Sequence, residues 1–188
     1  MLRSSLIIFL LALSANASAE FDYNFFEFTY SDIEFDDIDV DGDALGIGGS
    51  FELNDDVFVF GSYQDADLDF SVDATTFGIG VGYHTPLSEV VDLVANVSYQ
   101  WVEVDAPGFG DEDEDGFGLG VGMRFAATPE FEVNAGISYV DLGDGGDDTA
   151  LSVGGLYNFT DAFTAGIGGS FSDDVSSISL IARLYFGR

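Results

Sequence analysis

The chain has 188 residues, enough for one domain, and its 35 acidic residues against four Lys and Arg give a formal net charge of −31. Such an excess of acid excludes nucleic acid as a partner, because a phosphate backbone is bound by Lys and Arg. There is no cysteine, so disulfides do not hold the fold together. With 15% aromatic and 47% hydrophobic residues the chain is also unlike disordered acidic chains, which lack aromatic and β-branched side chains.

The first nineteen residues have the pattern of a secretory signal peptide. Arg3 precedes an apolar run at 6–13, and the small residues Ala17 and Ala19 then form a cleavage site. The apolar run is too short for a transmembrane helix, which takes about 20 apolar residues. The sequence therefore predicts a signal peptide at 1–19, cleaved on export, and a single domain at 20–188.

Apolar residues alternate with small or polar residues through most of that domain. In one segment, for example, Leu45, Ile47 and Phe51 alternate with glycine and serine. A period of two residues is typical of β-strands with two different faces. Four hairpin units, a first strand and a last strand give ten strands; the first strand lies near 23–31 and the hairpins at 46–63, 78–99, 118–139 and 152–171.

Short connections and longer acidic connections alternate between these strands. Short turns are predicted at 54–56, 84–90, 126–130 and 160–162. Longer loops, which hold most of the Asp and Glu, are predicted at 32–42, 65–72, 105–114 and 141–147. Strands of about ten residues with short turns at one end and long loops at the other are typical of transmembrane β-barrels. In such barrels the short turns face the periplasm and the long loops face outward.

Two observations favour a membrane barrel over a secreted soluble barrel of the lipocalin type. The face opposite the apolar one is mostly Gly, Ser and Asn, whereas a solvated face would be rich in Lys, Glu and Thr. Aromatic residues of the apolar face collect near the strand ends, as in the two girdles of a lipid-facing surface. They are Phe51, Tyr83, Phe125, Tyr157 and Phe186 toward the short turns, and Tyr63, Tyr99, Trp101, Tyr139 and Phe171 toward the long loops.

The signal peptide, the Gly-rich strands and the alternating last strand together resemble the small outer-membrane β-barrel proteins of Gram-negative bacteria, a group that includes OmpX and the OmpA membrane domain. The predicted fold is all-β, a transmembrane antiparallel up-and-down β-barrel of ten strands, with eight strands as the alternative because that number is usual in the group. The resemblance implies the outer membrane as location, with outer-membrane lipid, lipopolysaccharide and the barrel-insertion machinery as partners. We expect a monomer.

Two motifs before and within the second strand resemble ligand sites. Asp37, Asp39 and Asp41 begin like a calcium loop, but Gly48 stands at the twelfth position, where an EF-hand needs a bidentate Glu. A looser Ca²⁺ or Mg²⁺ site at these aspartates stays open, and no other cofactor is expected. The glycines at 46–49 resemble a phosphate cradle, yet no helix follows to bind a phosphate at its N-terminus. The sequence predicts strand interior there.

Charged residues of the small-residue face are predicted to point into the barrel near its periplasmic end. Unpaired charges in that place would be costly, so we expect an interior salt-bridge network formed by Arg124, Arg183, Glu52, Asp92 and Glu132. A narrow barrel filled by such side chains is closed or nearly so.

The only histidine of the chain, His84, is predicted to lie in a short periplasmic turn before Thr85 and Pro86. Barrel enzymes that resemble this architecture hold a catalytic histidine near the outer rim, at the opposite end. The sequence therefore predicts a non-enzymatic outer-membrane barrel with strongly acidic extracellular loops and a structural or adhesive role at the envelope. The alternative is a narrow, porin-like channel selective for small cations, which the loop charge would attract.

Overall fold

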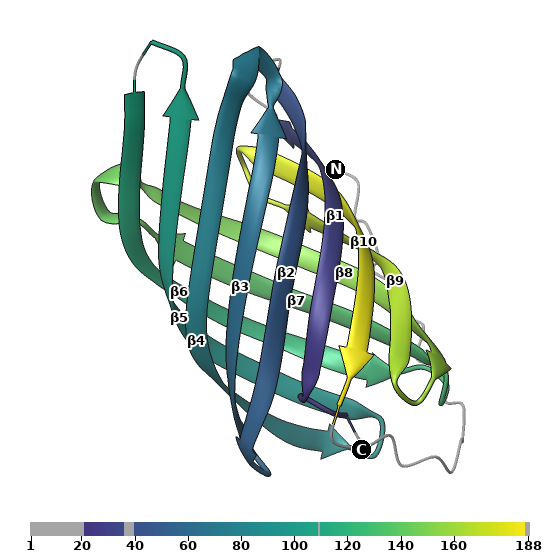
Figure 1. Ribbon diagram of the computed structural model, residues 1–188. Coiled ribbons are helices and arrows are strands. Elements are labelled where there is room, and N and C mark those ends of the chain that lie inside the picture. Colours follow the sequence, from purple (N-terminus) through teal and green to yellow (C-terminus); the bar gives the residue numbers. More distant parts are fainter. Residues whose placement is uncertain (1–20, 36–39, 109, 187–188) are drawn as a thin grey trace, which may run out of the picture.

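The computed structural model describes residues 21–35, 40–108 and 110–186, and they form a closed antiparallel β-barrel (Figure 1). Every strand pairs with its neighbours in sequence, and β1 closes the barrel against β10. The strands are β1 (Phe25–Phe35), β2 (Val40–Asn54), β3 (Val57–Leu68), β4 (Val72–Ser88), β5 (Val91–Ala106), β6 (Gly110–Ala126), β7 (Phe131–Asp141), β8 (Asp147–Thr160), β9 (Phe163–Phe171) and β10 (Val175–Tyr185).

The predicted ten-strand up-and-down barrel is confirmed, and the eight-strand alternative is wrong. Two short 3₁₀ helices, Asp69–Ser71 and Gly143–Gly145, lie in the connections β3–β4 and β7–β8. No helix in the described part of the chain has the length and apolar character needed to cross a membrane. The predicted signal peptide at 1–19 lies outside the described residues.

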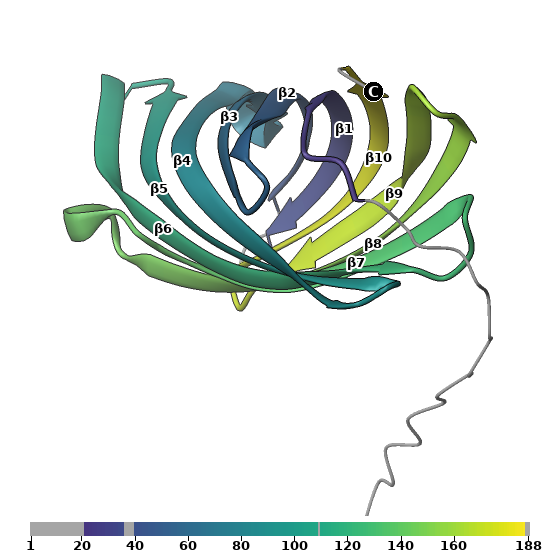
Figure 2. The ribbon, with the colours of Figure 1, turned by 90° about the horizontal axis from the view of Figure 1, so that it is seen from below.

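The strands are strongly tilted. β7 and β8 form part of the barrel wall on the side opposite β1 to β3 (Figures 1 and 2). The connections after β2, β4, β6 and β8 are short and gather at the end of the barrel where β1 begins and β10 ends (Figure 1). We call this the short-turn end, and the opposite end the loop end. In outer-membrane barrels the short turns face the periplasm.

Large apolar side chains cover the outside of the barrel. Leu45 is 64% exposed, and the aromatic residues Phe51, Tyr83, Tyr63 and Tyr99 are likewise exposed. Nine of the ten predicted girdle residues occupy outward positions of the strands, and Phe186 directly follows β10. Tyr63 and Tyr99 lie near the middle of β3 and β5 rather than at their ends, because these strands continue into the acidic segments. An apolar surface of this extent is suited to lipid rather than to water.

Inward glycines give room to neighbouring side chains, as predicted for a narrow barrel. A Cβ at Gly82 would collide with the ring of Phe58, and a Cβ at Gly120 would lie 2.7 Å from the side-chain amide of Asn96. The glycine face of the strands is therefore the lumenal face, and side chains from adjacent strands fill the space that the glycines leave.

The prediction that the long acidic segments are loops is mostly wrong, because β-pairing continues through them. β5 and β6 pair as far as Ala106 and Gly110, and β3 and β4 pair as far as Leu68 and Val72. In the segment 65–68, acidic residues alternate with Ala and Leu, so the period of two residues continues beyond the girdle. Carboxylates on one face of a strand do not interfere with its backbone hydrogen bonds, so the hairpins extend further than the apolar pattern indicates.

Candidate functional site

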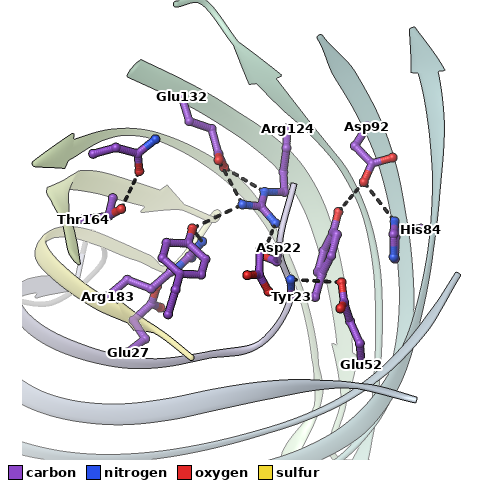
Figure 3. A network of polar contacts seen from close by, with 12 residues as sticks. Asp22, Tyr23, Glu27, Glu52, His84, Asp92, Arg124, Glu132, Thr164 and Arg183 are labelled. Carbon is purple, nitrogen blue, oxygen red and sulfur yellow. Dashed lines mark hydrogen bonds and ion pairs between the residues drawn. The ribbon is translucent and has the colours of Figure 1, made fainter. Parts of the chain in front are cut away.

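Side chains from most of the strands meet across the lumen at the short-turn end (Figure 3). The segment 21–24, which precedes β1, lies among them, and Tyr23 is only 3% exposed. We call this group the lumenal layer; its members are Tyr23, Glu27, Glu52, Phe58, His84, Asp92, Arg124, Glu132, Arg183 and Tyr185.

The ion pair between Arg124 of β6 and Glu132 of β7 is deeply buried in the layer. Arg124 Nε donates to Glu132 Oε1 at 2.8 Å and Nη2 donates to Oε2 at 2.9 Å, which is a bidentate geometry. The two residues are 8% and 7% exposed. The remaining Arg124 nitrogen, Nη1, donates to the backbone carbonyl of Asp22 at 3.1 Å, and the guanidinium lies 4.7 Å from the ring centre of Tyr23. Arg124 therefore joins the barrel wall to the N-terminal segment.

The second ion pair joins the two strands that close the barrel. Glu27 of β1 lies directly opposite Arg183 of β10, and Arg183 donates to Glu27 Oε2 from Nη2 at 2.7 Å and from Nε at 2.9 Å. The hydroxyl of Tyr185 accepts hydrogen bonds from Arg183 Nη1 at 3.3 Å and from Arg124 Nη2 at 3.4 Å. Tyr185 thus connects the two ion pairs.

Tyr23 fills the other side of the layer, next to His84 and Asp92. Its hydroxyl donates to Asp92 Oδ2 at 2.8 Å, and His84 Nδ1 lies 3.0 Å from the same oxygen. The Tyr23 ring stacks on His84 with 4.1 Å between ring centres and on Phe58 with 4.7 Å. Burial is the main cause that raises the pKa of Tyr23. A neutral hydroxyl that donates to a buried carboxylate is therefore the stable form.

The prediction that His84 is a turn residue is wrong. β4 continues to Ser88, and His84 is buried on its lumenal face, while its backbone N–H donates to the carbonyl of Asp56 at 2.8 Å. Pro86 indicated a turn from the sequence, but the β4–β5 pairing contains a register shift between Pro86 and Ser88 that lets the strand continue past the proline.

Glu52 binds the N-terminal segment rather than an arginine. Its carboxylate accepts from Asn24 Nδ2 at 2.6 Å and from the backbone N–H of Tyr23 at 3.2 Å. Asn24 Oδ1 in turn accepts from the backbone N–H of Glu52 at 3.0 Å. Together with Arg124 and Asp92, Glu52 holds the segment 21–24 inside the mouth of the barrel.

All five residues of the predicted interior network lie in this layer. Only two of them, Arg124 and Glu132, form an ion pair with each other, and the other three have partners outside the predicted set. Arg124 contacts Glu132, whereas Arg183 pairs with Glu27, which the prediction did not include. Sequence reasoning also missed Tyr23. The signal for Glu27 was available, because it alternates with Phe26 and Phe28 on β1 and so belongs to the lumenal face.

A cavity of about 490 Å³ lies directly on the loop side of the layer. Tyr23, Arg124, Glu132 and Arg183 form part of its lining. The remaining wall comes from lumenal side chains of β1, β2, β3, β5, β7, β8 and β10 and from the glycines of β6.

The loop end carries a second concentration of charge, on the outer face of the strands. The carboxylates lie directly opposite one another along neighbouring strands in the order Asp32, Asp43, Asp67, Asp73 and Asp105, and all five residues are exposed. We call them the acidic row. Partial loss of hydration, followed by the charges of Asp67, Asp105 and Asp65, raises the pKa of Asp73. Like charges in directly opposed positions destabilise a sheet.

The predicted metal site is only partly within the described residues. Asp41 lies on β2 opposite Glu34 of β1 and is exposed, while Asp37 and Asp39 fall outside the described part of the chain. Within the described ranges, no three His, Asp or Glu side chains come close enough together to hold a metal ion. The Ca²⁺ or Mg²⁺ site at these aspartates stays a prediction.

A closed barrel with an apolar outer surface and a polar, charge-paired interior defines a transmembrane β-barrel protein. Residues 5–172 match the family described as outer membrane protein beta-barrel domain, and the chain belongs to this family. Membership places the protein in the outer membrane of Gram-negative bacteria.

Two solved porin structures share the fold at low sequence identity. The NanC porin is 8% identical, with a TM-score of 0.52 over 86% of this chain and 100% of that chain. The KdgM porin is 9% identical, with a TM-score of 0.50 over 86% of this chain and 99% of that chain. Neisserial surface protein A is 18% identical, with a TM-score of 0.44 over 86% and 95% of the two chains. No curated protein sequence matches this chain.

Proposed function

We propose that the protein is a non-enzymatic outer-membrane barrel with a closed lumen that acts at the cell surface, in envelope structure or adhesion. The observation that carries the proposal is the lumenal layer, in which both arginines are bound to carboxylates and the segment 21–24 is hydrogen-bonded into the mouth. Strands β1 to β7 and β10 each supply a side chain to this layer. Breaking buried ion pairs to open a pore would be costly.

The loop end supports a role in contact with other surfaces. Phe70, at the β3–β4 connection, is 78% exposed, and both Phe70 and Ser71 have positive φ angles, of 63° and 59°. Residues other than glycine rarely adopt this conformation, and strain of this kind is concentrated at functional sites. An aromatic ring presented at a hairpin tip above an acidic surface suits adhesion better than solute transport.

Recordings of single channels in planar lipid bilayers test the closed lumen. We expect no steady conductance from the native protein, and conductance steps from a Tyr23→Ala variant, which removes the ring that stacks on Phe58 and His84. A Tyr83→Ala variant is the matched control, since Tyr83 is exposed on the outer face. Steady steps from the native protein would contradict the proposal.

The alternative function is a narrow channel for small cations. It is favoured by the cavity on the loop side of the layer, together with the acidic charge of the loop end, which would raise the local cation concentration. Under this alternative the native protein conducts, and the reversal potential in a KCl gradient shows selectivity for K⁺ over Cl⁻.

We further propose that loosely bound Ca²⁺ or Mg²⁺ links the acidic loop end to lipopolysaccharide phosphates. Support comes from the repulsion within the acidic row, which divalent cations would relieve. The measurement is the urea midpoint of unfolding in vesicles with MgCl₂ and with NaCl at equal ionic strength. A larger stabilisation by MgCl₂, reduced in an Asp73→Asn variant, is expected; equal effects of the two salts would refute the idea.

A further inference from the structure

We propose that the cavity on the loop side of the lumenal layer is a binding site for a small uncharged carbohydrate. Its volume of about 490 Å³ lies within the range of roughly 300–1,000 Å³ that is common for small-molecule sites. The proposal holds whether or not the lumen conducts, because it concerns occupancy of the cavity rather than passage through the layer.

Two chemically different walls face each other across this cavity. One wall contains the rings of Phe25, Phe58 and Phe60, from β1 and β3. The other contains Asn134 of β7 and Ser152 of β8, on the opposite side of the barrel (Figure 2). A sugar ring has an apolar C–H face and a rim of hydroxyl groups, so it can lie against aromatic rings while amide and hydroxyl groups bind its edge.

The charge balance of the lining indicates an uncharged ligand. Both guanidinium groups that border the cavity are already bound, Arg124 to Glu132 and Arg183 to Glu27. All three nitrogens of each guanidinium have a hydrogen-bond acceptor within the protein. An anionic ligand would meet the carboxylates of Glu27 and Glu132 beside the guanidinium groups, and a cationic ligand would meet the guanidinium groups beside the carboxylates, so neither gains an unpaired counter-charge in the lining.

The hydroxyl group of Ser50, beside the cavity, lacks a hydrogen-bond partner in the described part of the chain. Ser50 lines the cavity from β2 and is 6% exposed, and its hydroxyl oxygen has no hydrogen-bond partner among the described residues. A buried hydroxyl without a partner is costly, and most such groups in proteins are satisfied. The oxygen itself is screened from the cavity, so a hydroxyl of a bound sugar would supply the missing partner once the Ser50 side chain rotates toward it.

The experiment is isothermal titration calorimetry on the full-length folded barrel in detergent micelles, with glucose, galactose and maltose as neutral probes. Galacturonate and glucosamine are the charged counterparts of similar size. We expect at least one neutral sugar to bind at least tenfold more tightly than either charged sugar. An absence of binding by all three neutral sugars, or tighter binding of a charged sugar, would overturn the proposal.

Variants locate the binding within the barrel. Ser50→Val should weaken binding about tenfold, and Ser152→Leu, which fills the cavity from the opposite wall, should abolish it. Ser31→Val is the matched control, since Ser31 is a buried lumenal serine that bonds to Ser179 and does not line the cavity. Each variant is first checked for heat-modifiable mobility on an unboiled gel. If both cavity variants bind like the control, the site lies elsewhere and the proposal fails.

Discussion

Replacing Arg124 by methionine should destabilise the barrel strongly. The side chain makes a bidentate ion pair with Glu132, one hydrogen bond to the backbone of Asp22 and one to Tyr185. Methionine retains much of the length and apolar stem but leaves the carboxylate of Glu132, whose side chain is 10% exposed, without its counter-charge. Breaking one partner of a buried pair costs about 3–5 kcal/mol.

The partner substitution makes this prediction sharper. In the double variant Arg124→Met with Glu132→Met, no buried charge is left unpaired, and replacement of a whole buried pair by apolar residues is often nearly neutral. The loss in the double variant should therefore be smaller than the loss in Arg124→Met alone. The coupling energy of the double-mutant cycle should be about 2–3 kcal/mol.

Urea unfolding in phospholipid vesicles measures these differences, with the fluorescence of Trp101 as the probe. Trp101 is the only tryptophan and lies opposite Phe77 in the outer aromatic girdle, so its environment changes from lipid to water on unfolding. Arg183→Met is the comparison variant: the Glu27 side chain that it leaves is 25% exposed, so the cost should be smaller. A loss below about 1 kcal/mol for Arg124→Met, or strictly additive losses in the cycle, would refute the reasoning.

Three further predictions concern other parts of the barrel. Tyr23→Phe removes the hydrogen bond to a buried carboxylate and should lower the free energy of unfolding by about 1.5–3 kcal/mol, measured by the same urea titration. Gly166→Ala should prevent formation of the compact band on unboiled gels, because its Cβ would collide with a backbone carbonyl of β8, whereas Gly61→Ala, with no atom nearer than 3.5 Å, should fold normally. The raised pKa of Asp73 means that the folded protein binds this proton more tightly than the unfolded chain, so stability falls as pH rises above the ordinary Asp range. Asp73→Asn should therefore stabilise the barrel at pH 7 and have little effect at pH 3; equal effects at both pH values would contradict this.

The sequence by itself determined the barrel, its two faces and its girdles. Each of these is a local property, since alternation along a strand such as 45–53 assigns every side chain to a face without reference to any other strand. The lumenal placement of Arg124, Arg183 and Glu132 followed from the same alternation. At 65–68 acidic and apolar residues also alternate with a period of two, which indicates a strand, although the acidic residues there were predicted to form a loop.

Only the tertiary structure decided which groups meet. The register of β1 against β10 sets Glu27 opposite Arg183, although 156 residues separate them in the chain. The placement of segment 21–24 in the barrel mouth depends on hydrogen-bond partners from β2, β5 and β6, which no local pattern brings together. The burial of His84 depends on the pairing of β4 with β5, which continues in register through His84 to Pro86. The face to which a side chain belongs follows from the geometry of a single strand. Its contact partners depend on the closure of all ten strands into a barrel. The lumenal layer and the cavity on its loop side therefore exist only in the folded barrel.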